Sequence, residues 1–106
     1  MVTIEQFAAM TQRIIASGGF DNFLPTACYP ERREVATLEG LPSDIEPEPA
    51  VLKWAAKNAK RGELHLVAFK SGPSQFTVVR VDGAKRESAV FEVADAETDA
   101  APMADG

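Results

Sequence analysis

The sequence is poor in the residues from which catalytic and metal sites are built. It contains one cysteine, Cys28, and one histidine, His65, among 106 residues. A single cysteine excludes an internal disulfide, which fits a reducing compartment, and we expect the protein in the cytoplasm. One cysteine and one histidine fall short of the three or four ligands that a zinc site uses. We therefore expect neither a bound metal nor a cofactor.

Long apolar runs and phosphate-binding loops are missing as well. No stretch approaches the roughly 18 consecutive apolar residues of a membrane span, and the first residues show no basic segment followed by an apolar run, as a signal peptide would. Gly18-Gly19 is the only glycine pair. It follows a predicted helix, whereas a phosphate cradle leads from a strand into a helix. These absences argue against a membrane contact and favour a non-catalytic protein over an enzyme.

Charge is distributed unevenly along the chain, whose net charge is −5. Residues 95–106 carry four acids and no base and are rich in alanine, so we expect a disordered acidic tail. Residues 1–94 then hold twelve acids against eleven bases and form a single, nearly neutral domain. A nearly neutral domain disfavours nucleic acid as the partner, because binding it requires several phosphates to be neutralised together.

Hydrophobic spacing and capping residues predict two helices. The first covers residues 3–17, with a capping box from Thr3 to Gln6 and a stop at Gly18-Gly19. The second covers residues 49–61 and stops at Gly62. The predicted inner faces consist of Phe7, Ala8, Met10, Ile14 and Ile15 in the first helix and Leu52, Ala55, Ala56 and Ala59, flanked by Val51, in the second.

Alternating apolar residues predict the strands of an antiparallel meander. Residues 64–70 are apolar on both faces, which is typical of a central strand. Residues 76–81 and 88–93 form a hairpin with a loop over 82–87, because this register brings apolar residues opposite each other. The predicted fold class is α+β, with a three-stranded antiparallel sheet packed against two helices. Two points stay open: whether both helices lie on one face of the sheet, and whether residues 34–38 add a fourth strand. We expect an irregular extended path for 26–29 and a linker for 39–49.

Basic residues line the outer side of the second predicted helix, and an aromatic residue borders them. Lys53, Lys57, Lys60 and Arg61 form this stripe, and Trp54 lies between it and the core side. Lys85 and Arg86 lie at the tip of the predicted hairpin. Tryptophan and arginine are enriched at protein-binding hot spots. We therefore predict a small non-catalytic protein-binding module, a regulator, inhibitor or adaptor, whose partner is another protein with an acidic surface, and a partly exposed Trp54.

Two other functions compete with this hypothesis. One is a small enzyme or ligand-binding domain with a pocket around Cys28 and His65, completed by Tyr29 and by Arg32 or Arg33. The other is single-stranded nucleic-acid binding through the lysine stripe. Simpler explanations are ordinary packing of Cys28 and His65 and a solvated helix face for the lysines. Contact between Cys28 and His65 in a cleft would favour the enzyme.

Overall fold

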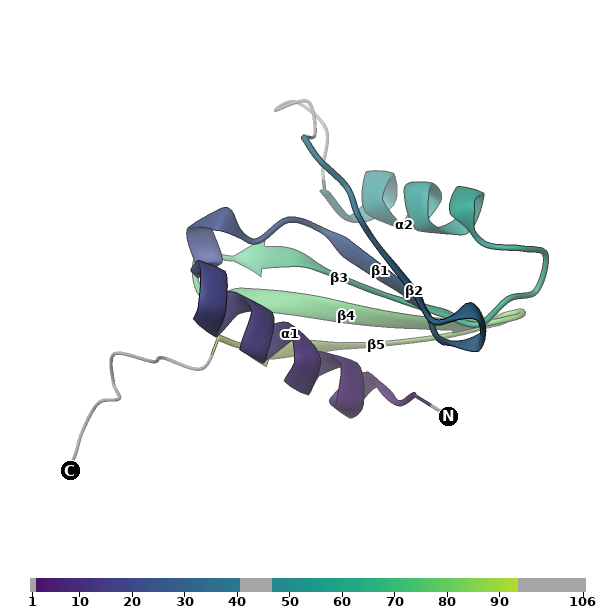
Figure 1. Ribbon diagram of the computed structural model, residues 1–106, viewed down its shortest axis with the longest axis horizontal. Helices are drawn as coiled ribbons and strands as arrows, with labels where there is room; N and C mark the ends of the chain where they lie inside the picture. Colours follow the sequence, from purple (N-terminus) through teal and green to yellow (C-terminus); the bar gives the residue numbers. More distant parts are fainter. Residues whose placement is uncertain (1, 41–46, 94–106) are drawn as a thin grey trace.

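The computed structural model describes residues 2–40 and 47–93 and contains two helices, two short 3-10 helices and five strands (Figure 1). The predicted tail and residues 41–46 of the predicted linker lie outside the described residues. The elements are α1 (Ile4–Gly18), η1 (Phe20–Asn22), β1 (Thr26–Tyr29), η2 (Pro30–Arg32), β2 (Glu34–Thr37), α2 (Pro47–Asn58), β3 (His65–Gly72), β4 (Gln75–Asp82) and β5 (Lys85–Glu92).

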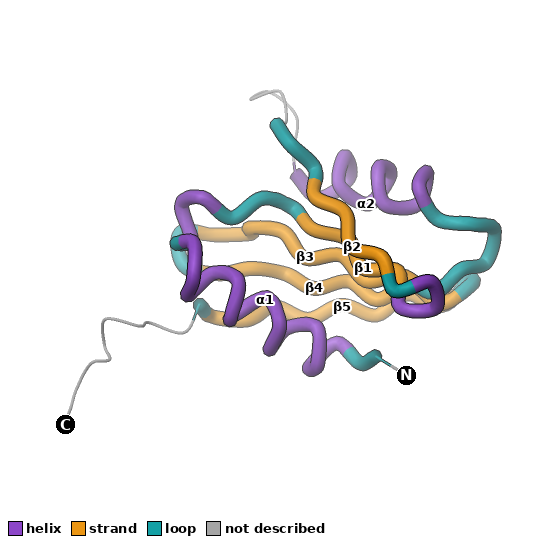
Figure 2. The backbone as a smooth tube through the Cα atoms, in the orientation of Figure 1, coloured by secondary structure: helices purple, strands orange, loops and turns teal. Residues whose placement is uncertain are grey.

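The five strands form one antiparallel sheet in the order β2-β1-β3-β4-β5 (Figure 2). The α+β class, the central position of β3 and the strand at 34–38 are confirmed. Residues 26–29 form a regular strand, β1, instead of the irregular path that we expected. Pro25 and Pro30 flank this strand: the Pro25 carbonyl accepts a hydrogen bond from the backbone N–H of Leu38 at 2.8 Å, and Pro30 opens η2. Prolines that flank a strand cost it no ladder hydrogen bond.

Helix α1 begins and ends at the predicted signals. Thr3 accepts a hydrogen bond from the backbone N–H of Gln6, and the Gln6 side chain accepts one from Thr3, so the capping box is confirmed. At the other end, Gly19 adopts a φ of 88°, a conformation that residues other than glycine rarely adopt. Ile14 does not belong to the inner face as predicted, because 43% of it is exposed.

The two helices cover opposite faces of the sheet, so the option of a shared face is wrong (Figure 1). One core lies between α1 and the sheet and includes Phe7, Ile15, Leu66, Phe76 and Val78. The other lies under α2 and includes Tyr29, Val51, Ala55, Val67 and Phe69. Successive residues of β3 alternate between the two cores, as side chains of a strand alternate between the faces of its sheet. This explains why β3 is apolar on both faces.

The turn between β4 and β5 is shorter than predicted. Gly83 and Ala84 form a two-residue loop, and Val79 lies opposite Ser88 where we had expected Val90. Gly83 has a φ of 62°, the sign that the first position of a type II′ hairpin turn requires. Pairing of apolar residues was a poor guide here, since β5 is an edge strand and 60% of Val90 is exposed.

Helix α2 lies two or three residues earlier in the chain than predicted. It starts at Pro47 and ends at Asn58, and Gly62 belongs to the turn that follows. Val51 and Ala55 are its fully buried residues, whereas Ala56 is exposed and is not part of the inner stripe. Neither described helix is both long and apolar enough to cross a membrane.

Candidate functional site

The outer side of α2 carries Lys53, Trp54 and Lys57 of the predicted set. Lys60 and Arg61 lie beyond its last residue, Asn58, in the turn that leads to β3, so a single helical stripe of four bases was wrong. Lys53 and Lys57 are exposed, and Trp54 is half-buried at the margin of the core under α2. The predicted partial exposure of Trp54 is therefore confirmed. Lys57 follows Trp54 by three residues, a spacing that places two side chains next to each other on a helix. The indole and these ammonium groups consequently form one continuous strip of surface.

Side chains at the C-terminal end of β1 and in η2 hold the C-terminus of α2. The last four carbonyls of a helix have no partner within it. The Tyr29 hydroxyl donates to the carbonyl of Ala55 at 2.8 Å, and Arg32 Nη2 donates to the carbonyl of Asn58 at 2.7 Å. The Arg32 guanidinium also lies over the Tyr29 ring, 4.3 Å from its centroid. These contacts fix the part of α2 that presents Trp54 and Lys57.

Arg32 also links this helix end to the start of β3. Its Nε donates to Glu63 Oε2 at 2.9 Å, its Nη1 pairs with Glu34, and Glu63 Oε1 accepts from the backbone N–H of Lys60 at 2.9 Å. The hydrogen bond from Arg32 and, to a smaller extent, the one from the Lys60 N–H hold the pKa of Glu63 below its usual value. Glu63 therefore stays ionised near neutral pH, and its role is to stabilise the turn between α2 and β3.

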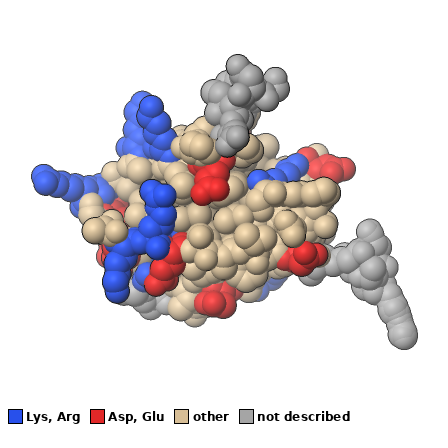
Figure 3. Space-filling view, turned by 180° about the vertical axis from the view of Figure 1, so that it is seen from behind, with Lys and Arg blue, Asp and Glu red and all other residues tan. Residues whose placement is uncertain are grey.

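The fold gathers most basic residues at one end of the sheet. At this end, β1 runs into η2, β3 begins and the chain turns from β4 into β5. The pairing of His65 with Val81 and of Asp82 with Lys85 places these strand ends side by side. Figure 3 shows basic side chains crowded toward one end, with acidic ones among them. We define the cationic surface as the exposed bases of α2, of the turn after it and of the start of β5, together with the half-buried Trp54: Lys53, Trp54, Lys57, Lys60, Arg61, Lys85 and Arg86.

The bases of the cationic surface are free to meet a partner. Within the described residues, the cations that form ion pairs are Arg32 and Arg80, neither of which belongs to this surface. Lys60 and Arg61 line a shallow hollow of about 350 Å³ together with residues of η2. Carboxylates stand at the same end: Glu31, Glu34, Glu63, Asp82 and Glu87. The surface is thus predominantly, but not uniformly, positive.

Cys28 and His65 project from opposite faces of the sheet. Cys28 pairs with Leu66 in the β1–β3 ladder, so it shares the face of Leu66, and His65 points to the other face. The two side chains therefore do not line one pocket. Burial raises the pKa of the Cys28 thiol, which keeps it protonated. His65 is buried beside Tyr29, with ring centroids 5.9 Å apart, and its Nδ1 lies 3.1 Å from the Glu63 carbonyl.

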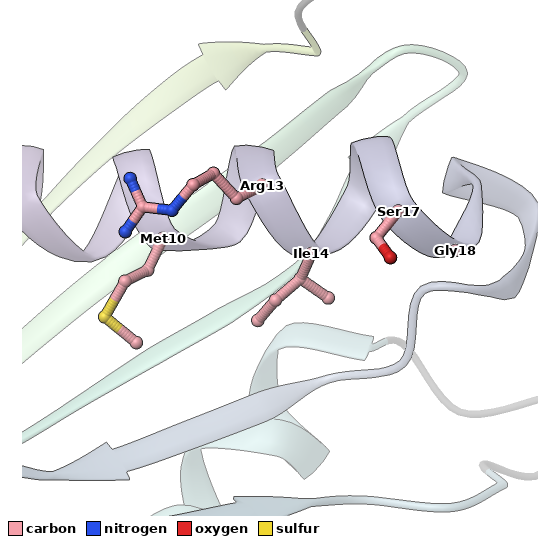
Figure 4. Close-up of a pocket in the computed structure, with 5 residues that line it drawn as sticks. All are labelled: Met10, Arg13, Ile14, Ser17 and Gly18. Carbon is pink, nitrogen blue, oxygen red and sulfur yellow. The ribbon is translucent and has the colours of Figure 1, made fainter.

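A hollow along α1 was missed by the sequence analysis. Met10, Arg13, Ile14, Ser17 and Gly18 line this space of about 500 Å³, into which Met10 and Ile14 point (Figure 4). Its lining is mainly apolar and offers one charged group. The signal for it was the width of the apolar stripe of α1, which exceeds what the sheet covers. The hollow holds no arrangement of acids, bases or nucleophiles that suggests chemistry.

Comparison with known proteins assigns no identity to this site. No family model matches the chain, and no curated protein or solved structure is significantly similar to it. In the part of the chain that the structure describes, no group of three or more His, Cys, Asp or Glu side chains could hold a metal ion.

Proposed function

We propose that this protein is a small non-catalytic binding module that docks through the cationic surface onto an acidic surface of another protein. The observation that carries this proposal is the gathering of bases without ion pairs from two separate parts of the chain, residues 53–61 and the start of β5, at one end of the sheet. Complementary charge steers two proteins together and fixes their orientation.

The half-buried Trp54 supports a protein partner. Its position at the margin of the core leaves part of the indole available while the rest is held by packing. An aromatic side chain that is already ordered loses little conformational entropy on binding, and tryptophan is the residue most typical of hot spots. The anchoring of Ala55 and Asn58 by Tyr29 and Arg32 keeps this helix end rigid as well.

The carboxylates at the same end favour a protein over nucleic acid. Glu31, Glu34 and Glu87 are exposed beside the bases. Each would face a phosphate backbone with like charge, which opposes binding. A protein surface carries both signs and can place its own cations opposite these groups, so that the carboxylates contribute to specificity.

The test is affinity capture from the source cells, followed by mass spectrometry, with the intact chain and three variants. Trp54→Ala and Lys57→Glu alter the cationic surface. Arg13→Glu is the matched control, because Arg13 is an exposed base on α1, across the sheet. We expect an acidic protein that the wild type and Arg13→Glu capture, and that Trp54→Ala and Lys57→Glu capture at least fivefold less, a loss of about 1 kcal/mol.

Salt and kinetics separate this mode of binding from others. Lys57→Glu should slow association and weaken its dependence on salt, since a charge at the rim acts mainly by steering. The proposal is wrong if the captured partner binds Lys57→Glu and Arg13→Glu equally well. It is also wrong if the captured material disappears on nuclease treatment, which would identify a nucleic-acid ligand.

A further inference from the structure

Strand β5 lies at one edge of the sheet. It pairs with β4 on one side, and no described strand lies on the other. The backbone N–H of Val93 donates to the carbonyl of Ser74 at 2.8 Å, which sets the alternation of the ladder. In an antiparallel pair the residues bonded across the ladder alternate with residues that turn away. Arg86, Ser88 and Val90 therefore direct their backbone N–H and C=O groups outward, away from β4.

A side chain of α1 confirms this direction at the end of the strand. Gln12 Nε2 donates to the carbonyl of Glu92 at 2.8 Å, so this carbonyl points away from β4, as the alternation requires. The second lone pair of the oxygen remains able to accept another hydrogen bond. The edge contains no proline and no bulge, two of the devices that prevent strand pairing, and its charged residues stand at the two ends of the strand. Ser88 and Val90 are exposed beside it.

We propose that β5 pairs antiparallel with β5 of a second copy of this chain, around a two-fold axis at Ala89. Ser88 then lies opposite Val90 of the second copy, and Arg86 lies opposite Glu92 of the second copy. The two sheets join into one continuous sheet. A two-fold interface of this kind is closed, so it produces a dimer and not a filament.

The charges of β5 select this register. Residues whose backbone groups point outward must pair with outward-pointing residues of the second copy. The two-fold axis can therefore pass through any one residue of β5, and neighbouring registers differ by one residue in the position of the axis. An axis at Ser88 places Arg86 opposite Val90, and an axis at Val90 places Ser88 opposite Glu92. Among the axes from Glu87 to Phe91, which pair the larger part of the strand, only the axis at Ala89 brings opposite charges together, and it does so twice because of the symmetry. Cross-strand pairs of opposite charge stabilise a sheet.

The two charged side chains are available for this pairing. Arg86 is exposed and forms no ion pair within the described residues. Glu92 is exposed, and its carboxylate accepts a hydrogen bond from the neutral amide of Gln75 at 3.2 Å, which orients it on the face that Arg86 shares. At the axis, the small side chain of Ala89 permits the close approach of a non-hydrogen-bonded pair.

The experiment is sedimentation equilibrium of the full chain from low micromolar to near-millimolar concentration, with charge variants. We expect a monomer–dimer equilibrium in the wild type. Arg86→Glu replaces two attractions with two repulsions and should raise the dimer dissociation constant about tenfold. The double variant Arg86→Glu/Glu92→Arg should restore dimerisation. Lys85→Glu is the matched control: it makes the same charge change one residue away, on the other face of β5, and should have a much smaller effect.

Amide hydrogen exchange provides a second measurement. The outward N–H groups of Ser88 and Val90 should be protected at dimer concentrations and exchange fast in the monomer, while the inward N–H of Ala89 is protected in both. A chain that stays monomeric at near-millimolar concentration overturns the proposal. So does a dimer in which Ser88 and Val90 exchange fast, or one in which the double variant fails to recover. Far-ultraviolet circular dichroism of each variant verifies that the monomer is folded.

Discussion

Removal of the Tyr29 hydroxyl should destabilise the protein by about 2 kcal/mol. The hydroxyl donates to the carbonyl of Ala55 at 2.8 Å, and both residues are buried. Ala55 belongs to the last turn of α2, so its carbonyl has no helical partner to fall back on. Tyr29→Phe keeps the ring but leaves a buried acceptor unsatisfied, which costs about 1–3 kcal/mol. A loss of this size lowers the melting temperature by about 10 °C in a domain of this length.

Thr11→Val is the matched control for this prediction. The Thr11 hydroxyl is also buried and donates to a backbone carbonyl, that of Phe7, at 2.9 Å. That carbonyl lies inside α1 and keeps its helical hydrogen bond when the hydroxyl is removed. Valine and threonine have similar helix propensities. We expect a change within about 0.5 kcal/mol, because no acceptor is orphaned.

Urea and thermal unfolding, followed by circular dichroism, measure both variants. Equal losses of stability for Tyr29→Phe and Thr11→Val would refute the reasoning, since the capping of α2 would then contribute nothing specific. Tyr29 is the only tyrosine in the chain, so its phenol can be titrated by absorbance. Burial raises the pKa of Tyr29 above its usual 10.0, so the absorbance change should occur at a higher pH than in a tyrosine peptide.

Three further predictions concern other parts of the fold. Because the pKa of Glu63 is lowered in the folded state, its carboxylate stabilises the fold at pH values above the usual pKa of 4.5. This stabilisation is lost as the pH falls through the lowered pKa, so Arg32→Met should flatten the acid part of the stability–pH curve. Cys28 should react with a thiol reagent near neutral pH more slowly than a cysteine peptide does, and rapid labelling would contradict its burial. Gly83→Ala should cost about 1 kcal/mol in urea unfolding because of the positive φ.

The sequence predicts well those features that depend on neighbouring residues. The capping box at Thr3, the stop at Gly19 and the apolar alternation of β3 all act through contacts within a few residues. The partial exposure of Trp54 follows from its angle on the helix, which a wheel provides without knowledge of the fold. The positions of Lys53 and Lys57 on the outer side of α2 could be predicted for the same reason, whereas the end of the helix before Lys60 and the proximity of these bases to the β4–β5 turn could not.

Features that depend on distant pairing were harder to predict. The register of β5 was wrong because apolar cross-strand pairs guide pairing only where a face is buried, and the α2 side of this edge strand is open. The relation of Cys28 to His65 depends on the offset between β1 and β3, which no local pattern encodes. The strand β1 itself is short, and its flanking prolines suggested irregular structure although both lie just outside it.

The two cores impose an order on the assembly of the molecule. The core under α2 draws mainly on elements close in sequence, since α2 leads directly into β3. Helix α1 packs on β3, β4 and β5, and its residue Phe7 joins a cluster with Phe76 and Val78. Contacts over such separations form late, because the closure of a long loop must come first. During synthesis, the apolar face of α1 leaves the ribosome before the strands that it covers, and it remains without these partners until the β3–β4 hairpin has been made.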